Sequence, residues 1–376
     1  MRILIVNAGS SSLKLTVLDD GDQVLLAENI PAPAGRLDDA ALREAVAQSR
    51  PVDAVGHRIV HGGTEFTEPV LVDAQVLRRL EALTDLAPLH QPKSLRGLEL
   101  VGRMLPNVPA VACFDTAFHA GIPPAASTYA LPAPWRKRWE LRRFGFHGLS
   151  HAYAARRTAE LAGRSLSDLQ IVTCHLGAGA SLAAVRGGTS VDTTMGFTPL
   201  EGLVMATRSG SVDPGLLLWL EEHVGMPPTE LATTLEHRSG LLGLTGRSDM
   251  SGILQAEADG DADAGLAVSV YVHRLRAGIA AMTAAMSGLD ALTFTGGVGE
   301  HAPEIRRRAA DGLGFLGIGL DPGANQAVSP DAEIGAPGAS VRSFVVQARE
   351  DLEIARGVRQ VLGGAALPST PGGSAR

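Results

Sequence analysis

The sequence predicts an α/β protein in which one domain plan occurs twice. Two segments carry this plan, each with an apolar strand, a turn of small residues, a second strand and a polar end: RILIVNAGSSSLKLTVLDDG at 2–21 and QIVTCHLGAGASLAAVRGG at 170–188. Two hairpins of the same build, far apart in one chain, indicate a duplicated domain. The length agrees with this prediction, because 376 residues exceed what one hydrophobic core usually holds.

The turns of both hairpins have a composition that suits phosphate binding. Glycine, serine and asparagine leave backbone N–H groups open, so a phosphate group can approach them closely. A single glycine-rich hairpin is most often a tight turn with no further role. Two such hairpins facing each other across a cleft between domains would bind a polyphosphate from both sides, and the duplication favours this interpretation.

The composition argues against nucleic acid and membranes as partners. The formal net charge is −7, and the chain has only 3 Trp, 3 Tyr and 9 Phe, whereas a nucleic-acid surface needs a basic stripe and aromatic stacking platforms. The chain enters a strand at once without a signal sequence, and it has no uncharged apolar run of membrane-spanning length. Cys113 and Cys174 lie in apolar runs and are expected to be buried thiols in a reducing compartment. We therefore expect a cytoplasmic protein.

The first half of the chain alternates between helical and strand patterns. Helical spacing predicts three helices, at 40–47, 73–86 and 94–105. Apolar runs predict two strands, at 54–60 and 109–115. The second strand ends at Asp115, and open α/β sheets place their chemistry at the carboxyl ends of strands. One acid at a strand end is more often a turn residue or a helix cap, so Asp115 is a candidate only together with its neighbours.

The second half begins with a helix from about 150 to 161, for which Ser150 is the expected N-cap. A long stretch with frequent glycine and proline, at 192–215, carries Arg208, and irregular loops of that length tend to be functional. Further helices are expected at 215–224, 263–286 and 350–362, and strands at 291–295 and 343–346. The strand at 291–295 leads into a third glycine turn, and Pro303 opens another helix. The chain has neither a P-loop pattern nor G-x-G-x-x-G.

Two histidine pairs with a spacing of four residues raise the question of a metal site. They are His57 with His61 and His147 with His151. Neither pair lies wholly in a helical pattern, and no cysteine or carboxylate completes a ligand set, so a transition-metal site is disfavoured.

Eight motifs, taken together and in order, resemble the acetate kinase (acetokinase) family, a branch of the superfamily of acetate and sugar kinases, Hsc70 and actin. They are VNAGSSSLK at 6–14, HRIVHGG at 57–63, FDTAFH at 114–119, FGFHGLSH at 144–151, HLGAGAS at 175–181, MGFTPLEGL and TRSGSVDPG within 195–215, and FTGGVGE at 294–300. The resemblance implies a duplicated ribonuclease H-like (actin-like ATPase) fold, with two domains that each hold a mixed five-stranded sheet and that hinge about a cleft. On this basis we expect an N-terminal domain at 1–147 joined by the helix at 350–362, a nucleotide-binding C-terminal domain at 148–349, and a disordered tail at 366–376.

The reaction that the resemblance implies is the reversible transfer of the ATP γ-phosphoryl group to acetate, with Mg²⁺. Acetate is already ionised at pH 7, so the site needs no general base and must instead neutralise charge on an in-line transition state. The resemblance assigns Arg58 and Arg208 to the carboxylate and the moving phosphoryl group, which suit bidentate donors. It assigns His147 to the phosphoryl oxygens, with His90 and His175 in support. Asp115 would position the acceptor complex and help to hold Mg²⁺.

The other assignments that the resemblance implies concern the metal, the nucleotide and the methyl group. Mg²⁺, which Mn²⁺ can replace, would be held mostly through water by Asn7 and Glu350. ATP or ADP would contact Ser10, Ser12, Lys14, His175, Gly177, Ala178, Gly179, Asp249, Gly296, Gly297 and Gly299. The acetate methyl group would lie in an apolar pocket beside Arg58 and His90, formed by Val60, Leu89, Phe146 and Pro199. The expected partners are acetate, ATP and a second copy of the chain in a homodimer.

Two departures from the family pattern lie on the nucleotide side. Ala178 stands where the family often has Asn, and Ser251 stands where the segment S-D-x-R has Arg. Three interpretations remain: an acetate kinase, a kinase for a longer acid such as propionate or butyrate, and a nucleotide-binding protein without turnover. Pocket depth decides between the first two, and the presence of both arginines and Asp115 argues against the third.

Overall fold

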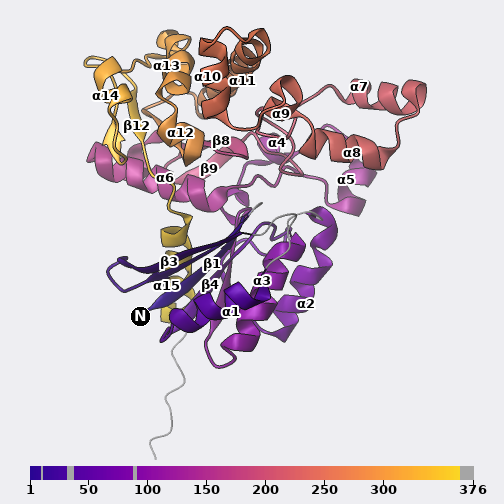
Figure 1. The fold of residues 1–376 in the computed structure, drawn as a ribbon, viewed down its shortest axis with the longest axis vertical. Coiled ribbons are helices and arrows are strands. Elements are labelled where there is room, and N and C mark those ends of the chain that lie inside the picture. Colours follow the sequence, from indigo (N-terminus) through magenta and orange to yellow (C-terminus); the bar gives the residue numbers. More distant parts are fainter. Residues whose placement is uncertain (10–11, 32–37, 88–90, 365–376) are drawn as a thin grey trace, which may run out of the picture. The chain divides into compact units, whose positions relative to one another are not determined.

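The computed structural model describes residues 1–9, 12–31, 38–87 and 91–364 (Figure 1). The chain divides into two units. The first comprises Met1–Ala117 and the chain from Glu350 onward, and the second comprises Phe118–Arg349. Each unit holds one six-stranded mixed sheet, with helices packed against it. The tail predicted at 366–376 lies outside the described residues.

The sheet of the first unit has the strand order β3-β2-β1-β4-β6-β5. Its strands are β1 (Ile3–Ala8), β2 (Ser12–Leu18), β3 (Val24–Pro31), β4 (Ala54–Ile59), β5 (Val70–Leu71) and β6 (Ala110–Phe114). The first three strands form an antiparallel meander, β1, β4 and β6 run parallel, and β5 pairs antiparallel with β6 at the edge. The continuous burial of residues 3–6 is typical of a strand that is covered on both faces.

Four helices pack against this sheet, namely α1 (Asp39–Gln48), α2 (Ala74–Ala82), α3 (Gln91–Met104) and α15 (Glu350–Gly364). Successive residues of β4 face different helices, as the period of a strand requires. Val55 packs in one core with Leu42 of α1 and Val101 of α3, whereas Gly56 lies against Ile354 of α15. A Cβ atom at position 56 would lie 2.5 Å from Ile354 Cγ2, so glycine allows α15 to pack directly on the strand. The helix at 350–364 therefore belongs to the first unit.

The second unit repeats this sheet strand for strand. Its order is β9-β8-β7-β10-β12-β11, formed by β7 (Gln170–Leu176), β8 (Ala180–Arg186), β9 (Thr189–Thr193), β10 (Ala291–Thr295), β11 (Ala332–Glu333) and β12 (Arg342–Val345). Every pairing has the same sense as its counterpart in the first unit. Both sheets also have a register shift between their second and third strands. The predicted duplication is therefore confirmed.

The helices of the second unit are α4 (Pro124–Ser127), α5 (Ala133–Trp139), α6 (Gly148–Ala162), α7 (Pro214–Trp219), a π-helical turn η5 (Leu220–Val224), α8 (Pro228–His237), α9 (Gly240–Thr245), α10 (Met250–Ala258), α11 (Ala262–Met286), α12 (Gly296–His301), α13 (Pro303–Asp311) and α14 (Pro322–Gln326). Figure 1 shows α6 and α11 on opposite sides of the sheet. On one side, Thr158 of α6 lies 2.7 Å from Thr293 of β10, hydroxyl to hydroxyl. On the other, Gly278 of α11 allows close approach to Leu182 of β8.

Residues 118–147 pack with the second unit, although the sequence places them in an N-terminal domain that ends at 147. The reason is a set of contacts with β9 and the loop that follows it. The Phe144 N–H donates to Gly196 O at 3.0 Å, Arg143 forms an ion pair with Glu201 at 2.8 Å, and His119 Nδ1 lies 2.8 Å from Ser190 Oγ. These partners are distant in sequence, so no local pattern announces them.

The expectation of five strands in each sheet is wrong, because each sheet has six. The additional strands are β5 and β11, two residues each, which pair antiparallel with an edge of the five-stranded core. A pairing of two residues leaves no periodic pattern in a sequence.

The prediction of a third glycine turn after the strand at 291–295 is also wrong, because residues 296–301 form helix α12. Gly296 starts this helix with a φ of 78°, where a Cβ atom would lie 2.9 Å from Leu176 O. Glycine is therefore required at this position for the chain to turn out of β10.

Two further findings concern membrane spans and the cysteines. No helix in the described ranges is long and apolar enough to cross a membrane. Cys113 and Cys174 are free and buried, as predicted.

Candidate active site

Arg58 is the centre of a polar group in the first unit. Its Nε lies 3.0 Å from Asp115 Oδ1, and its Nη2 lies 2.6 Å from Asp115 Oδ2, so the guanidinium donates to both oxygens of the carboxylate. Its Nη1 donates to Asn7 Oδ1 at 3.0 Å. The side chain of Asp115 is only 2% exposed and that of Arg58 is 16% exposed. Burial acts to lower the pKa of Arg58, but Asp115 and Glu350 outweigh it and raise this pKa above its ordinary value, so the guanidinium stays charged.

The parallel strands of the first sheet bring this group together. Asn7 lies in β1 and Arg58 in β4, and Asp115 directly follows β6. The Asp115 N–H donates to Ile59 O, which extends the β4–β6 ladder to the carboxylate. The carboxyl ends of parallel strands meet at one edge of a sheet, which is where α/β proteins bind their ligands.

The oxygen atoms in this group fit a hard divalent cation. Asn7, Asp115 and Glu350 supply amide and carboxylate oxygens, which Mg²⁺ prefers, and Glu350 begins α15 close enough to Arg58 to raise its pKa. Within the described residues, no three His, Cys, Asp or Glu side chains are placed to share a metal ion. A metal here would therefore take few ligands from the protein and keep much of its water, as Mg²⁺ does.

Ser12 and Lys14 lie in β2, the strand that pairs with β1. Lys14 pairs with Asn7 across the antiparallel ladder and is exposed, so both side chains emerge on the same face of the sheet. Ser12 and Val60 are half-buried, and Val60 directly follows β4. Three predicted site residues lie outside the described part of the chain: Ser10, Leu89 and His90.

Histidines of the second unit are linked to serines by hydrogen bonds. His147 Nδ1 lies 2.9 Å from Ser181 Oγ, and the same hydroxyl lies 2.8 Å from His151 Nε2. His175 Nδ1 lies 2.8 Å from Ser150 Oγ, and the ring centroids of His147 and His175 are 4.4 Å apart. Burial lowers the pKa of His151 well below its ordinary value, so this imidazole stays neutral. Ser181 and Ser150, the serine partners of His147 and His175, carry no charge.

The prediction that Ser150 caps a helix is wrong. Helix α6 begins at Gly148, with His147 in the capping position at a φ of 56°. Ser150 lies inside the first turn, where its hydroxyl contacts His175 instead of a backbone N–H. A non-glycine residue with a positive φ is uncommon and often marks a functional position.

Arg208 extends to the turn of the β7–β8 hairpin. Its Nη1 donates to Pro199 O at 2.8 Å. A Cβ atom at Gly179 would lie 3.1 Å from His147 Nε2 and 3.4 Å from Arg208 Nη2. The missing side chain at Gly179 therefore leaves space where two nitrogen groups converge. Burial lowers the pKa of Arg208, although a guanidinium remains charged at neutral pH. Phe146 and Pro199 are buried in the same unit.

A cavity of about 680 Å³ lies within the second unit. Four predicted nucleotide contacts line it: Gly177, Ala178, Asp249 and Gly297. Leu241, Met250 and Leu254 give it apolar walls, and no lysine or arginine occurs among its described lining residues. The volume is typical of a site for a small ligand.

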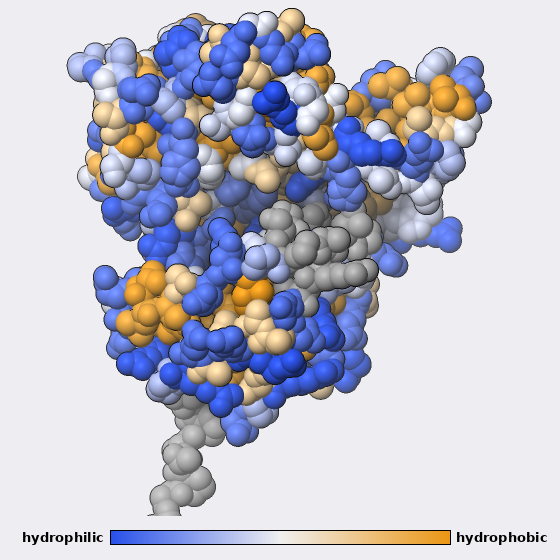
Figure 2. All heavy atoms as spheres, in the orientation of Figure 1, coloured by the Kyte–Doolittle hydropathy of each residue, from blue (hydrophilic) through white to orange (hydrophobic). Residues whose placement is uncertain are grey.

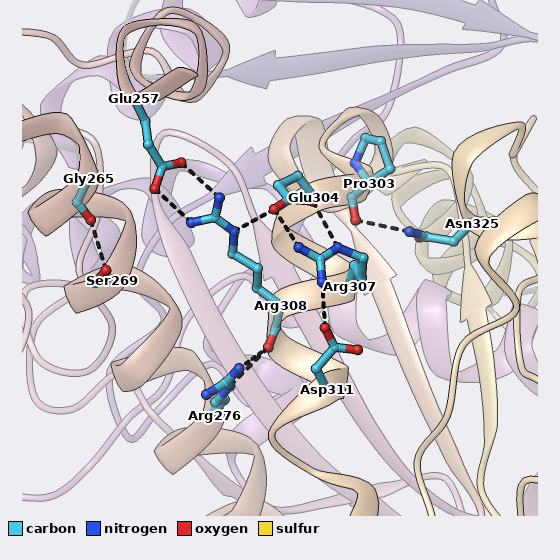
Figure 3. A network of polar contacts seen from close by, with 10 residues as sticks. All are labelled: Glu257, Gly265, Ser269, Arg276, Pro303, Glu304, Arg307, Arg308, Asp311 and Asn325. Atoms are coloured by element: carbon cyan, nitrogen blue, oxygen red, sulfur yellow. Dashed lines mark hydrogen bonds and ion pairs between the residues drawn. The ribbon is translucent and has the colours of Figure 1, made fainter. Parts of the chain in front are cut away.

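An ion-pair network supports one wall of this cavity (Figure 3). Arg308 of α13 makes two bonds to Glu257 of α10, at 2.8 and 2.9 Å, and a third to Glu304 at 2.6 Å. Arg276 of α11 donates to the carbonyl of Arg308 at 2.9 Å. The network joins three helices, and Glu304 is itself part of the cavity lining. Bidentate arginine pairs of this kind add geometric definition as well as energy.

Helix α12 brings the remaining glycines to the site. Gly297 is exposed, with open space where a Cβ atom would lie, whereas Gly296 and Gly299 are buried. Glu300 Oε1 accepts from the Gly296 N–H at 3.0 Å and from the Ala348 N–H at 2.9 Å, which ties the helix to the segment before α15. Asp249 caps α10 by accepting from the Gly252 N–H at 2.6 Å.

Sequence reasoning missed Ser181, Tyr271 and Glu300. Ser181 faces His175 across the hairpin, because the two are register partners in β7 and β8. That proximity was available from the hairpin pattern. Tyr271 lines the cavity from the middle of a helix whose other buried residues are mostly apolar, so its side chain carried no signal of its own.

A duplicated α/β fold, a cavity of nucleotide size with glycines in its lining, and buried arginine donors define a phosphotransferase for small molecules. The sequence profile of the Acetokinase family matches residues 35–356. An acetate kinase of Leifsonia xyli subsp. xyli is 46% identical over 391 residues, which cover 96% of this chain and 98% of that relative. The chain belongs to the acetokinase family.

Two solved structures show the same similarity in three dimensions. The acetate kinase of Porphyromonas gingivalis matches with a TM-score of 0.88 at 33% identity, covering 96% of this chain and 99% of its own. A propionate kinase from Francisella tularensis subsp. tularensis matches with a TM-score of 0.88 at 32% identity, with the same coverage. The α/β fold class predicted from the duplicated hairpins is therefore confirmed.

Proposed function

We propose that the protein transfers the γ-phosphoryl group of ATP reversibly to acetate, giving acetyl phosphate and ADP. The observation that carries the choice of acceptor is the state of Asp115, both of whose oxygens accept hydrogen bonds from Arg58. A hydroxyl acceptor needs a general base to take up its proton, and both oxygens of Asp115 are already occupied by Arg58. A carboxylic acid is already ionised at neutral pH and needs none. Membership of the acetokinase family supports this proposal.

The two arginines and His147 act in this proposal on the charge that the reaction brings together. Arg58 and Arg208 neutralise the acceptor carboxylate and the moving phosphoryl group, and His147 donates to the phosphoryl oxygens. Arg58 is held in advance by Asp115, and Arg208 by Pro199 O. Donors that are already oriented stabilise a developing charge without reorganising at the moment of reaction. Bound Mg²⁺, held through water by Asn7, Asp115 and Glu350, would neutralise further charge on the phosphates.

We assign the nucleotide to the cavity of the second unit. Gly177, Ala178 and Gly297 line this cavity with little or no side chain, so phosphates can approach the backbone closely there. The apolar walls at Leu241, Met250 and Leu254 suit the face of a base. The described lining holds no lysine or arginine, so it offers the base no contact with either side chain.

The acyl chain length is a second question within the same reaction class. The propionate kinase and the acetate kinase quoted above match this chain equally well by TM-score, so propionate is the competing acceptor. Val60, Phe146 and Pro199 are the described residues of the expected methyl pocket. We propose acetate as the preferred acid, with propionate used less well, because each additional methylene is worth only about 1–3 kcal/mol of discrimination.

A coupled assay of ADP release with acetate, propionate and butyrate in parallel tests these proposals. We expect acid-dependent release with Mg·ATP and the highest kcat/KM for acetate. A higher kcat/KM for propionate than for acetate would mean that propionate is the preferred acceptor. If no acid supported turnover, nucleotide binding without catalysis would be the remaining function.

We further propose a homodimer that forms through α7 and η5. Neither element contains a buried residue. Their exposed side chains include four large apolar ones: Leu216, Leu218, Trp219 and Val224. Figure 2 shows apolar surface gathered over α7 and η5. Short helices are stable only when an apolar face is packed. These side chains therefore require cover from a second copy, and dimers with twofold symmetry are the commonest arrangement.

Light scattering after gel filtration should show a dimer that Leu218→Glu converts to a monomer. The matched control is Phe315→Glu, at an exposed apolar residue elsewhere, which should remain dimeric; a wild-type monomer would contradict the proposal.

A further inference from the structure

Residues 194–201, the loop after β9, carry the acceptor that orients Arg208. Arg208 Nη1 donates to Pro199 O at 2.8 Å, and this is the one hydrogen bond that its guanidinium makes within the described ranges. An arginine side chain has several rotatable bonds, so a fixed acceptor is needed to select its direction. The direction of Arg208 therefore depends on where the 194–201 loop places Pro199.

Glu201, at the end of this loop, receives a hydrogen bond on each carboxylate oxygen. Arg143 Nη2 donates to Oε1 at 2.8 Å, and the Tyr129 hydroxyl donates to Oε2 at 2.6 Å. The side chain of Arg143 is only 16% exposed, and its guanidinium carbon lies 5.7 Å from the centre of the Tyr129 ring. Hydrogen bonds to an ionised group are short and strong. These three side chains, the Glu201 cluster, therefore hold one another in place.

The Glu201 cluster also binds the backbone of the loop. Arg143 Nη1 donates to the carbonyls of residues 194 and 195, at 3.2 and 3.0 Å. The Phe197 N–H donates to the Tyr129 hydroxyl at 2.8 Å. Burial and Glu201 raise the pKa of Tyr129, so the phenol keeps the proton that it donates to the carboxylate and offers a lone pair to the N–H. Phenylalanine in place of Tyr129 would leave the Phe197 N–H without this acceptor.

The loop is shaped around the carboxylate of the cluster. A Cβ atom at Gly196 would overlap both Glu201 Oε2 and the Tyr129 hydroxyl, so glycine is required at this position. An ion pair at a protein surface contributes little to stability by itself, and such a pair needs no loop fitted to its oxygens. The fitted loop instead gives fixed support to two residues of the proposed site, Pro199 and Arg208.

We propose that the Glu201 cluster positions Arg208 for the reaction: it fixes the 194–201 loop, and the loop holds the guanidinium through Pro199 O. The inference rests on the proposed function, because it takes Arg208 to bind the acceptor carboxylate and the moving phosphoryl group. A donor stabilises developing charge only while its geometry is kept, and a small displacement is costly. None of the three side chains of the cluster is among the described lining residues of the cavity in the second unit, so nucleotide binding should not depend on them.

The first variant is Tyr129→Phe, which removes the oxygen between Glu201 and the Phe197 N–H and keeps the ring beside Arg143. We expect kcat to fall at least about tenfold, because the guanidinium is displaced from the reacting groups. The KM for ATP and the Kd of ADP, measured by calorimetric titration, should stay within about twofold of the wild type. Glu201→Gln, which offers one oxygen to two donors, should change the same quantities in the same direction.

The matched control is Glu333→Gln, which breaks another bidentate arginine pair of the second unit. Glu333 accepts from Arg342 at 2.8 and 2.6 Å, and it lies in β11, outside the 194–201 loop. Its kcat and KM values should equal those of the wild type. Thermal unfolding of each variant sets an assay temperature at which all of them are folded, so that a loss of kcat is not a loss of folded protein.

A double-mutant cycle shows whether the effect passes through Arg208. In the background Arg208→Ala there is no guanidinium to position, so adding Tyr129→Phe should change kcat by no more than about twofold. A further tenfold loss in the double variant would mean that Tyr129 acts independently of Arg208, and would overturn the inference. Wild-type kcat in Tyr129→Phe, or a rise in the Kd of ADP as large as the fall in kcat, would also overturn it. If the wild type showed no acid-dependent turnover, the proposed function itself would be wrong, and the inference with it.

Discussion

Arg58 is at once part of the proposed site and part of the buried structure. Its removal leaves Asp115, only 2% exposed, as an unpaired buried charge, and breaking such a pair costs about 3–5 kcal/mol of stability. A loss of activity in Arg58→Ala is therefore ambiguous by itself. The double variant Arg58→Ala with Asp115→Asn removes both charges and is the form in which folding can be separated from catalysis.

We predict that Arg58→Ala and Arg208→Ala each lower kcat/KM at least ~100-fold. Removing one oriented hydrogen-bond donor to a developing charge costs on the order of 3 kcal/mol of transition-state stabilisation, which corresponds to a loss of this size. Lysine at either position should restore little, because a point charge lacks the bidentate geometry of the guanidinium. Steady-state kinetics at several acetate concentrations measure the effect, and Arg138→Ala on the exposed face of α5 is the control. Activity within threefold of the wild type would remove that arginine from the site.

Ala178 and Ser251 line the cavity without offering a charged contact to a base. An apolar slot discriminates by only about 1–3 kcal/mol, whereas a site whose polar groups would be left unpaired rejects an analogue strongly. We expect GTP to be used within roughly tenfold of ATP in kcat/KM. Introducing Ser251→Arg with Ala178→Asn should lower the KM for ATP and leave that for acetate almost unchanged. A preference for ATP above ~100-fold in the wild type, which equals about 2.8 kcal/mol, would show that other groups recognise the base.

The first turn of α12 combines two glycines with opposite requirements. Gly296 has a φ of 78°, and a Cβ atom there would lie 2.9 Å from Leu176 O, whereas Gly297 has open space at the same point. Gly296→Ala should therefore cost about 2 kcal/mol of stability or more, from a left-handed backbone and a close contact. Gly297→Ala should fold as the wild type does but raise the KM for ATP, since its methyl group projects into the cavity. Urea unfolding measures the stability of both variants, and steady-state kinetics measure their KM for ATP. Equal stability of the two variants would contradict the requirement for glycine at position 296.

At the level of elements, the sequence predicted what is periodic and missed what is short or held by distant partners. The duplicated hairpins, the strand ending at Asp115 and the long helix α11 follow from apolar spacing over many residues. Helices α8, α9 and α10 lie in segments with weak apolar patterns, and α9 has a single buried residue, Leu241. The contact of Ser150 with His175 joins α6 to β7, which no local pattern can reveal.

For the molecule as a whole, local sequence patterns predict only part of the candidate site, because the rest depends on contacts between distant elements. The motifs place Arg58 and Asp115 at strand ends and Asn7 at the start of the first hairpin turn, and the parallel pairing of β1, β4 and β6 then brings the three residues together. The hydrogen bonds of His147 with Ser181 and of Ser150 with His175 depend on side-chain packing between elements. Sequence patterns report the period and the ends of elements, whereas these contacts follow from the packing of several elements at once.

Buried histidines in both units make the protein sensitive to acid. Burial lowers the pKa of His57 in the first unit to about 3 and that of His119 in the second to about 4. The unfolded chain binds a proton at these positions near pH 6.5, and the folded chain does not. Each histidine therefore contributes its full share of stability above about pH 6.5, and this share is lost as the pH falls toward the folded pKa.

We expect His57 alone to account for about 1.4 kcal/mol of the stability lost between pH 7.5 and 5.5, because pH 5.5 lies one unit below the unfolded pKa. His57 lies in β4 and packs within the first unit, and its Nε2 has no hydrogen-bond partner among the residues described. His57→Leu removes the titrating group without breaking a hydrogen bond, so its free energy of unfolding should fall less between the two pH values. His273→Gln, at an exposed histidine of α11, is the control and should match the wild type. Urea unfolding at both pH values measures the difference, and an equal loss of stability in His57→Leu and the wild type would show that His57 takes up no proton on unfolding in this range.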